Sequence, residues 1–304
     1  MKKISGENSL ARLTIMLLLG GMFFGGCAEP VDPNRGQRYE LKGKIVSFNK
    51  AQRQVVVQHE AIPDFMEAMT MPFTLKEEGA FDVMHAGDTI QATLVVDDER
   101  TRLENPIISQ AIPTGAAKAA PTDGGLAEPE IGASVPDVSL VNQDGKRISL
   151  QQYRGRALLV TFIYTRCPLP DYCTLMSNNF AEIRRELDKS PERGAGAHLL
   201  SITLDPAYDT PKVLRSYGAA HTDNYQNEKF EDWEFATGKP EEIQRAANFF
   251  GMGYKQEGEE IVHSLRTALI TPDGKLHKMY RGNEWKPAEV VRDLREMQIQ
   301  NSDK

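Results

Sequence analysis

Short stretches of alternating apolar and polar residues fill the chain between residues 39 and 112 and predict β-strands. Successive side chains of a strand point to opposite faces of a sheet, so a half-buried strand shows a period of two residues. The stretches with this pattern are 39–49, 52–60, 69–75, 88–96 and 105–112. Five short strands in one segment are typical of a small all-β barrel of the oligonucleotide/oligosaccharide-binding type.

Beyond residue 131 the pattern changes to longer apolar runs that alternate with helical spacing. The runs 156–165 and 197–205 are almost continuously apolar and β-branched, as in strands that are buried on both faces of a sheet. The stretch 267–282 predicts a hairpin that turns at Asp273-Gly274. Helical spacing is present at 176–188, 210–221, 240–251 and 287–298. Strands that alternate with helices in this way predict an α/β sandwich.

Residues 113–130 follow neither pattern. They are rich in Ala, Gly and Pro and poor in large apolar side chains, which is typical of a flexible linker. We therefore expect two domains, one at 38–112 and one at 131–304, joined by this linker.

The segment 1–27 has the composition of an export signal. Lys2 and Lys3 precede a short apolar stretch, and two glycines precede Cys27. We therefore expect the body of the protein outside the cytoplasm. Cys27 after two glycines resembles the lipidation site of bacterial lipoproteins, which would hold the protein at the membrane. A plain signal peptide or an uncleaved signal anchor is the alternative.

The net charge, the apolar content and the number of cysteines limit the kinds of function that the protein can have. The chain has 36 basic and 43 acidic residues, a net charge of −7, which argues against a nucleic-acid partner. With one long apolar run, at its N-terminus, it does not have the pattern of a polytopic membrane protein. If Cys27 carries lipid, two of the three cysteines remain, Cys167 and Cys173. A close pair in an exported protein is a disulfide, a redox couple or a metal site.

The cysteine pair lies between the strand predicted at 156–165 and the helix predicted at 176–188. We expect Cys173 near the helix N-terminus, whose partial positive charge lowers the pKa of a thiol, with Arg166 as a further cation nearby. Five residues separate the cysteines, against two in a thioredoxin-type redox motif. The wider loop can close a disulfide, and it also leaves room for a soft cation such as Cu(I), with an imidazole as third ligand.

Several segments resemble, in consistent order, the Sco/SenC family of copper-binding proteins with a thioredoxin-like fold. They are YTRCPLPDYC, SITLDPAYDTPKVL, WEFATGKPEEI, the segment IVHS followed by ITPDGKL, and WKPAEVV. The resemblance implies that Cys167, Cys173 and His263 bind Cu(I) or Cu(II). It also implies delivery of copper to the CuA centre of cytochrome c oxidase subunit II or to another copper client. Many relatives have three residues between the cysteines, and an acidic residue where this chain has Val262.

Other side chains near these motifs have two interpretations each. Asp205 is expected either beside the metal site or as a cap of the next helix. Tyr164 and Tyr172 are expected either as walls of the site or as ordinary packing residues.

A second group of soft donors lies in the β-rich segment. Met69 and Met71 alternate on a predicted strand and therefore project from one face. Thioethers are neutral donors that select Cu(I) over harder cations, and His59 on the preceding strand could add a nitrogen. From the alternation alone, methionines that fill the core of a small barrel are the better explanation.

His59 together with Met69-Thr70-Met71 resembles the CusF-like periplasmic copper-binding domain, a small five-stranded barrel. The resemblance implies a Cu(I) site made by His59, Met69 and Met71. Where the family's tryptophan covers the metal, this chain has Met66, a further sulfur that could bind copper. His85 is expected on the surface.

Three functions are consistent with these residues. The first is a copper chaperone in which the N-terminal domain captures Cu(I) and passes it to the dithiolate site. The second is a thiol–disulfide oxidoreductase that acts on the cysteines of a copper-site client through Cys167 and Cys173. The third is copper buffering or resistance outside the cytoplasm.

Overall fold

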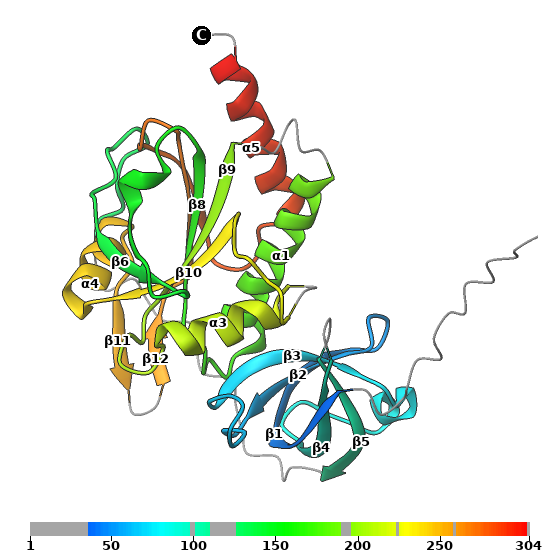
Figure 1. Ribbon diagram of the computed structural model, residues 1–304. Coiled ribbons are helices and arrows are strands. Elements are labelled where there is room, and N and C mark those ends of the chain that lie inside the picture. Colours follow the sequence, from blue (N-terminus) through cyan, green and yellow to red (C-terminus); the bar gives the residue numbers. More distant parts are fainter. Residues whose placement is uncertain are drawn as a thin grey trace, which may run out of the picture. The chain divides into compact units, whose positions relative to one another are not determined.

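The computed structural model describes residues 36–97, 101–109, 126–189, 196–222, 225–257 and 260–302 (Figure 1). The predicted signal segment with Cys27 and most of the predicted linker lie outside these residues. Residues Gly36–Lys304 form one compact unit. We call residues 36–109 the β-region and residues 126–302 the α/β-region. None of the helices in the described ranges has the length and apolar character that crossing a membrane requires.

The β-region consists of five strands, as the alternating pattern predicts. They are β1 (Gln37–Asn49), β2 (Gln54–His59), β3 (Met69–Leu75), β4 (Thr89–Val96) and β5 (Thr101–Ser109), with a 3₁₀ turn, η1 (Glu78–Asp82). The strands pair in the order β1–β2–β3–β5–β4, and β4 is also hydrogen-bonded to β1. The all-β prediction for this part of the chain is confirmed, with the fifth strand beginning earlier than expected.

The register of β1, β2 and β3 fixes the position of His59. His59 ends β2 and pairs with Met69, the first residue of β3, while Val57 pairs with Met71. On its other side His59 pairs with Gly43 of β1. A Cβ added at Gly43 would lie 2.7 Å from the Cα of His59, so β1 can approach β2 this closely because residue 43 has no side chain.

The α/β-region contains a seven-stranded sheet in the order β14–β13–β8–β9–β10–β6–β7. Its strands are β6 (Ser139–Asn142), β7 (Arg147–Ser149), β8 (Ala157–Ile163), β9 (Ala197–Thr203), β10 (Trp233–Gly238), β13 (Arg266–Ile270) and β14 (Leu276–Arg281). A separate pair is formed by β11 (Tyr254–Glu257) and β12 (Glu260–His263). The helical elements are η2 (Leu150–Tyr153), η3 (Pro170–Thr174), α1 (Leu175–Asp188), α3 (Pro211–Ala220), α4 (Pro240–Phe249) and α5 (Pro287–Ser302).

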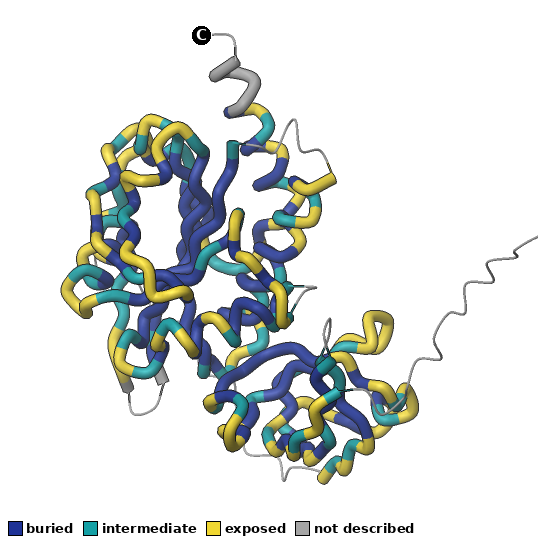
Figure 2. Tube along the Cα trace, viewed as in Figure 1, coloured by how far each residue is buried: buried dark blue, intermediate teal, exposed yellow. Residues whose placement is uncertain are grey.

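Two central strands explain why the α/β pattern is so clear in the sequence. Every residue of β8 and β9 is buried, as the apolar runs predict (Figure 2). These strands are parallel, and helices cover the sheet, with α1 packed against α5 and both α3 and α4 in contact with β10. The predicted α/β fold is confirmed. The strands β6, β7, β10, β11 and β12 are not predicted, because runs of three to six residues are too short for their periodicity to register.

Candidate metal sites

The two cysteines lie between β8 and α1, as the sequence predicts. Cys167 follows the end of β8, and Cys173 lies in the irregular turn η3, which leads into α1. Both thiols are free and buried. The backbone N–H of Tyr164 donates to Sγ of Cys173 over 3.4 Å. Sγ of Cys167 lies 3.9 Å from the carbonyl oxygen of Leu169. The pair is therefore shielded from solvent at the strand end.

The cysteines interact with each other, and their pKa values move apart. The hydrogen bond with Cys173 lowers the pKa of Cys167 to about 7, whereas burial raises the pKa of Cys173. Above about pH 7 Cys167 is therefore mostly thiolate while Cys173 keeps its proton. The expectation that the helix N-terminus makes Cys173 the acidic thiol is wrong, because burial outweighs a macrodipole effect of about 0.3–1 kcal/mol.

His263 ends β12 and is buried with one ring nitrogen in use. Its Nδ1 lies 2.9 Å from the carbonyl oxygen of Ser264 and must donate to it, since a carbonyl only accepts. Its Nε2 is buried without a hydrogen-bond partner among the described residues. Burial also lowers the pKa of His263. The ring is therefore held as a neutral imidazole whose Nε2 lone pair is available to a metal.

Two tyrosines connect His263 with the cysteines. The ring centroids of Tyr164 and Tyr172 lie 6.0 Å and 6.2 Å from that of His263, both edge-on. Burial, with the neighbouring thiol of Cys167 as the next cause, raises the pKa of Tyr164. The two tyrosines thus line the region between histidine and thiols. Within the described ranges no group of three His, Cys, Asp or Glu residues has metal-ligand spacing, so the predicted ligands are neighbours through Tyr164 without forming a coordination sphere.

Arg166 and Asp205 form an ion pair directly beside Cys167. The guanidinium of Arg166 donates to Asp205 over 2.7 Å and lies 4.0 Å from the ring centroid of Tyr208. Asp205 therefore stands next to the cysteine loop. Its alternative role as a helix cap is wrong, because the side chain of Thr210 caps α3 by accepting from the N–H of Val213.

Asp209 is a buried carboxylate that the sequence reasoning missed. It accepts hydrogen bonds from Oγ1 and N–H of Thr165 at 2.5 Å and 3.2 Å, and from Oγ1 of Thr203. Burial raises the pKa of Asp209 to about 6. Thr165 lies two residues before Cys167, so Asp209 fixes the segment that carries this thiol. The hydroxyl residues at the ends of two buried strands are the signal that could have identified it.

His59 of the β-region has the same arrangement as His263. Nδ1 of His59 lies 2.7 Å from the carbonyl oxygen of Glu60 and donates to it, and Nε2 is buried without a partner among the described residues. Burial lowers the pKa of His59 to about 4. Met69 is its cross-strand partner and Met71 follows on the same face of β3. Both methionine side chains are buried.

Met66 and His85 differ in their surroundings. Met66 is buried in a turn where its backbone exchanges hydrogen bonds with Ile62. His85 is exposed and lies 3.5 Å from Asp88, which agrees with the expected surface position. Burial of the methionines fits both core packing and metal binding. The buried Nε2 of His59 has no partner among the described residues, and a buried polar atom is costly unless a ligand satisfies it.

The depressed pKa of His59 predicts a loss of stability in acid for the metal-free protein. Its pKa is about 4 when folded and about 6.5 when unfolded. The unfolded state thus binds more protons between these values, and stability falls as pH falls through the window, by on the order of 3 kcal/mol. Urea unfolding of wild type and His59→Gln at pH 7 and pH 4 measures this. An equal pH dependence in both proteins would contradict it.

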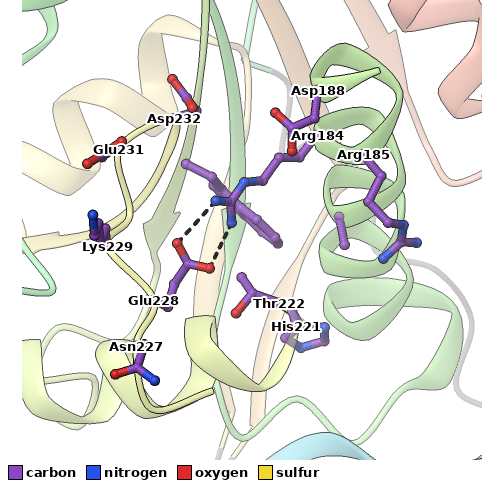
Figure 3. Close-up of a pocket in the computed structure, with 12 residues that line it drawn as sticks. Arg184, Arg185, Asp188, His221, Thr222, Asn227, Glu228, Lys229, Glu231 and Asp232 are labelled. Carbon is purple, nitrogen blue, oxygen red and sulfur yellow. Dashed lines mark hydrogen bonds and ion pairs between the residues drawn. The ribbon is translucent and has the colours of Figure 1, made fainter. Parts of the chain in front are cut away.

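A polar cavity of about 290 Å³ lies in another part of the α/β-region (Figure 3). Its described lining comes from α1 and from residues 221–222 and 227–233, and two hydrogen bonds of 3.0 Å and 3.1 Å pair Arg184 with Glu228. His221 also lines it. The described residues around this cavity include no cysteine or methionine. The cavity therefore does not offer the soft donors of the two candidate sites.

Both parts of the chain match known families. Residues 129–298 match the family model described as SCO1/SenC. Residues 38–105 match the model described as the copper-binding periplasmic protein CusF. Copper is named in the description of the CusF model, so copper as the cofactor expected from the family resemblance is confirmed.

Individual relatives and a solved structure are similar to about half of the chain. The SCO1 protein homolog of Bacillus subtilis (strain 168) is 32% identical over 159 residues, 51% of this chain and 77% of that protein. The mitochondrial SCO1 homolog of Homo sapiens is 28% identical over 154 residues, 49% of this chain and 48% of that protein. The structure of Arabidopsis thaliana ScoI with copper bound has 23% identity and a TM-score of 0.46, and covers 56% of this chain and 99% of that one. Because the SCO1/SenC model matches more than half of the sequence, the chain belongs to the SCO1/SenC family.

Proposed function

We propose that this protein is an exported copper chaperone with two copper sites, one in each region. The observation that carries the proposal is the shared state of two buried histidines. His59 and His263 each donate Nδ1–H to a backbone carbonyl and keep a buried Nε2 without a partner among the described residues. Metal-binding histidines are oriented in this way, by a hydrogen bond from the other ring nitrogen.

In the α/β-region the proposed ligands are Cys167, Cys173 and His263. Two thiolates and an imidazole suit Cu(I) because ligand and metal are both soft, and the imidazole also accommodates Cu(II). The lowered pKa of Cys167 makes a thiolate available near neutral pH. Binding of copper then displaces the proton held by Cys173.

In the β-region the proposed ligands are His59, Met69 and Met71, with Met66 as a further sulfur donor. Thioethers are neutral, so this site selects Cu(I). Two thiolates attract the cation more strongly than neutral thioethers do. We therefore propose that the β-region captures Cu(I) and that its transfer to the cysteines is thermodynamically favourable.

The proposed client is the CuA centre of cytochrome c oxidase subunit II, or another copper protein outside the cytoplasm. The SCO1/SenC match and the periplasmic CusF match support this assignment. Lipid on Cys27, or an uncleaved signal anchor, would keep the protein at the membrane where such a client is assembled. We also propose that the β-region and the α/β-region are separate domains joined by the segment around residues 113–130.

The chaperone assignment is tested by counting copper ions. The reduced wild-type protein is expected to retain two copper ions per chain in competition with a weak chelator. Cys167→Ala and Met69→Ala are each expected to retain one, because each removes a ligand from a different site. Metal analysis after gel filtration measures the ratio, with His85→Ala as the surface control that keeps two. One copper ion in wild type, or none lost in either variant, would contradict the two-site assignment.

Thiol–disulfide exchange is the second candidate function, and one observation favours it. An attacking thiol is most effective when its pKa is close to the ambient pH, and the pKa of Cys167 is about 7. Cys173 is close enough to hydrogen-bond Cys167 and could resolve a mixed disulfide. This chemistry does not need His263, which provides a test that separates the two functions.

A further inference from the structure

One backbone hydrogen bond joins the two candidate sites. The N–H of Thr70 donates to the carbonyl oxygen of Thr165 over 2.8 Å. Thr70 lies between Met69 and Met71 on β3, and Thr165 lies two residues before Cys167. The strand that carries the two methionines is therefore in contact with the segment that leads into the cysteine loop, inside the compact unit Gly36–Lys304.

Tyr208 makes a second contact at the same place. Its hydroxyl donates to the carbonyl oxygen of Ala68 over 2.5 Å, one residue before Met69. Its ring lies under the guanidinium of Arg166, the neighbour of Cys167. Tyr208 thus contacts Ala68 through its hydroxyl and Arg166 through its ring, and each of these residues directly precedes a proposed copper ligand.

The loop that carries Tyr208 is itself held by an ion pair and several hydrogen bonds. Asp205 pairs with Arg166, and the N–H of Asp209 donates to the carbonyl of Asp205 over 2.8 Å. The Asp209 carboxylate in turn binds both the N–H and the hydroxyl of Thr165. The carbonyl of Thr165 accepts the hydrogen bond from the N–H of Thr70. Loop 205–209 therefore positions both of the groups that meet the β-region.

We propose that loop 205–209 is a docking element that holds β3 against the cysteine loop, with Tyr208 as its contact residue, so that Cu(I) moves within one chain. This inference rests on the proposed function. In the transfer, bonds from copper to His59 and the thioethers break and bonds to two thiolates and His263 form. Copper stays Cu(I), and the proton of Cys173 leaves to solvent.

A fixed contact is favoured over a free tether for a physical reason. A flexible linker holds two domains at millimolar effective concentration, and most of their encounters are unproductive. Hydrogen bonds from Thr70 and Tyr208 select one orientation, in which the start of β3 is held against the segment that leads into the cysteine loop. Copper then has no need to be released to solvent between the sites.

Tyr208→Phe tests the docking, because it removes one hydroxyl and keeps the ring. Full-length protein with Cys167 and Cys173 oxidised to a disulfide is loaded with one equivalent of Cu(I), which the β-region would hold. A phosphine reductant then opens the thiols, and the thiolate-to-Cu(I) absorption reports transfer. We expect first-order transfer in wild type and transfer about fivefold slower in Tyr208→Phe, the effect of one net hydrogen bond. Tyr280→Phe removes a hydroxyl bound to Asp293 and is expected to change nothing.

Hydrogen exchange at the Thr70 amide gives a readout that does not need copper. This amide is expected to exchange faster in Tyr208→Phe than in wild type and Tyr280→Phe. Equal Thr70 exchange and equal transfer rates in all three proteins would overturn the docking proposal while leaving two copper sites in place. A wild-type chain that retains fewer than two copper ions would instead refute the proposed function, and the Thr70 amide would still report on docking.

Discussion

Replacing His263 with alanine is expected to weaken Cu(I) binding at the cysteine site by at least about 100-fold, because losing a group that only orients a ligand already costs 10–100-fold. The same variant is expected to keep its thiol–disulfide exchange, since attack and resolution need only Cys167 and Cys173. Competition with a Cu(I) chelator measures the first quantity. The rate of reduction of a small disulfide measures the second.

Two controls make the His263 result specific. His221 is also buried with an unpartnered Nε2 among the described residues, but it lines the cavity of Figure 3, whose described lining contains no sulfur. His221→Ala therefore removes a buried imidazole away from both proposed copper sites, and it is expected to leave the Cu(I) affinity unchanged. Cys167→Ala is expected to lose both activities. If His263→Ala bound copper as wild type does, the oxidoreductase would become the leading function.

Lowering the pH from 7 to 5 is expected to move Cu(I) from the cysteines to the His59 site. Copper must displace protons from Cys167, whose pKa is about 7, and from Cys173, whose pKa burial raises. Affinity at this site then falls by about 100-fold for each pH unit, since two protons are released. The pKa of His59 is about 4 and thioethers carry no proton, so the other site is little affected. Between pH 7 and pH 5, the Cu(I) affinity of the cysteine site relative to that of the His59 site therefore falls on the order of 10⁴-fold.

The pH shift is measured on protein with one Cu(I) per chain. X-ray absorption separates sulfur ligands at thiolate and thioether distances, and the thiolate absorption band is expected to disappear between pH 7 and pH 5. Met69→Ala supplies the matched control, because copper displaced from its cysteines has no second site and is expected to pass to a chelator. Thiolate-bound copper that persists in wild type at pH 5 would contradict the expected exchange.

The sequence predicts the elements well where apolar residues run continuously or largely alternate with polar ones. The apolar runs at β8 and β9 and the alternation along β1 to β4 are long enough to carry a period. The ligand residues are also visible, because Met69, Met71 and the cysteine pair are chemically distinctive. The protonation state of the cysteines cannot be predicted from the sequence, because the pKa of Cys173 depends on how deeply the turn buries its thiol.

The features that could not be predicted from the sequence depend on tertiary contacts. The carbonyls that fix Nδ1 of His59 and His263 belong to neighbouring residues, but their direction depends on backbone geometry. Tyr208 and Ala68 are 140 residues apart, so no local pattern joins them. Asp209 resembles an ordinary loop carboxylate until β8 and β9 bring Thr165 and Thr203 to it.

Gly43 imposes a condition on how this copper-binding architecture can evolve. The residue contributes no ligand, yet a methyl group there would press on the Cα of His59 and on the carbonyl oxygen of Gln58. Relatives that retain the histidine and both methionines but carry a larger residue at this position would have to move the histidine strand outward. Inherited metal specificity in this region therefore depends on an inconspicuous position that a comparison of donor atoms alone would overlook.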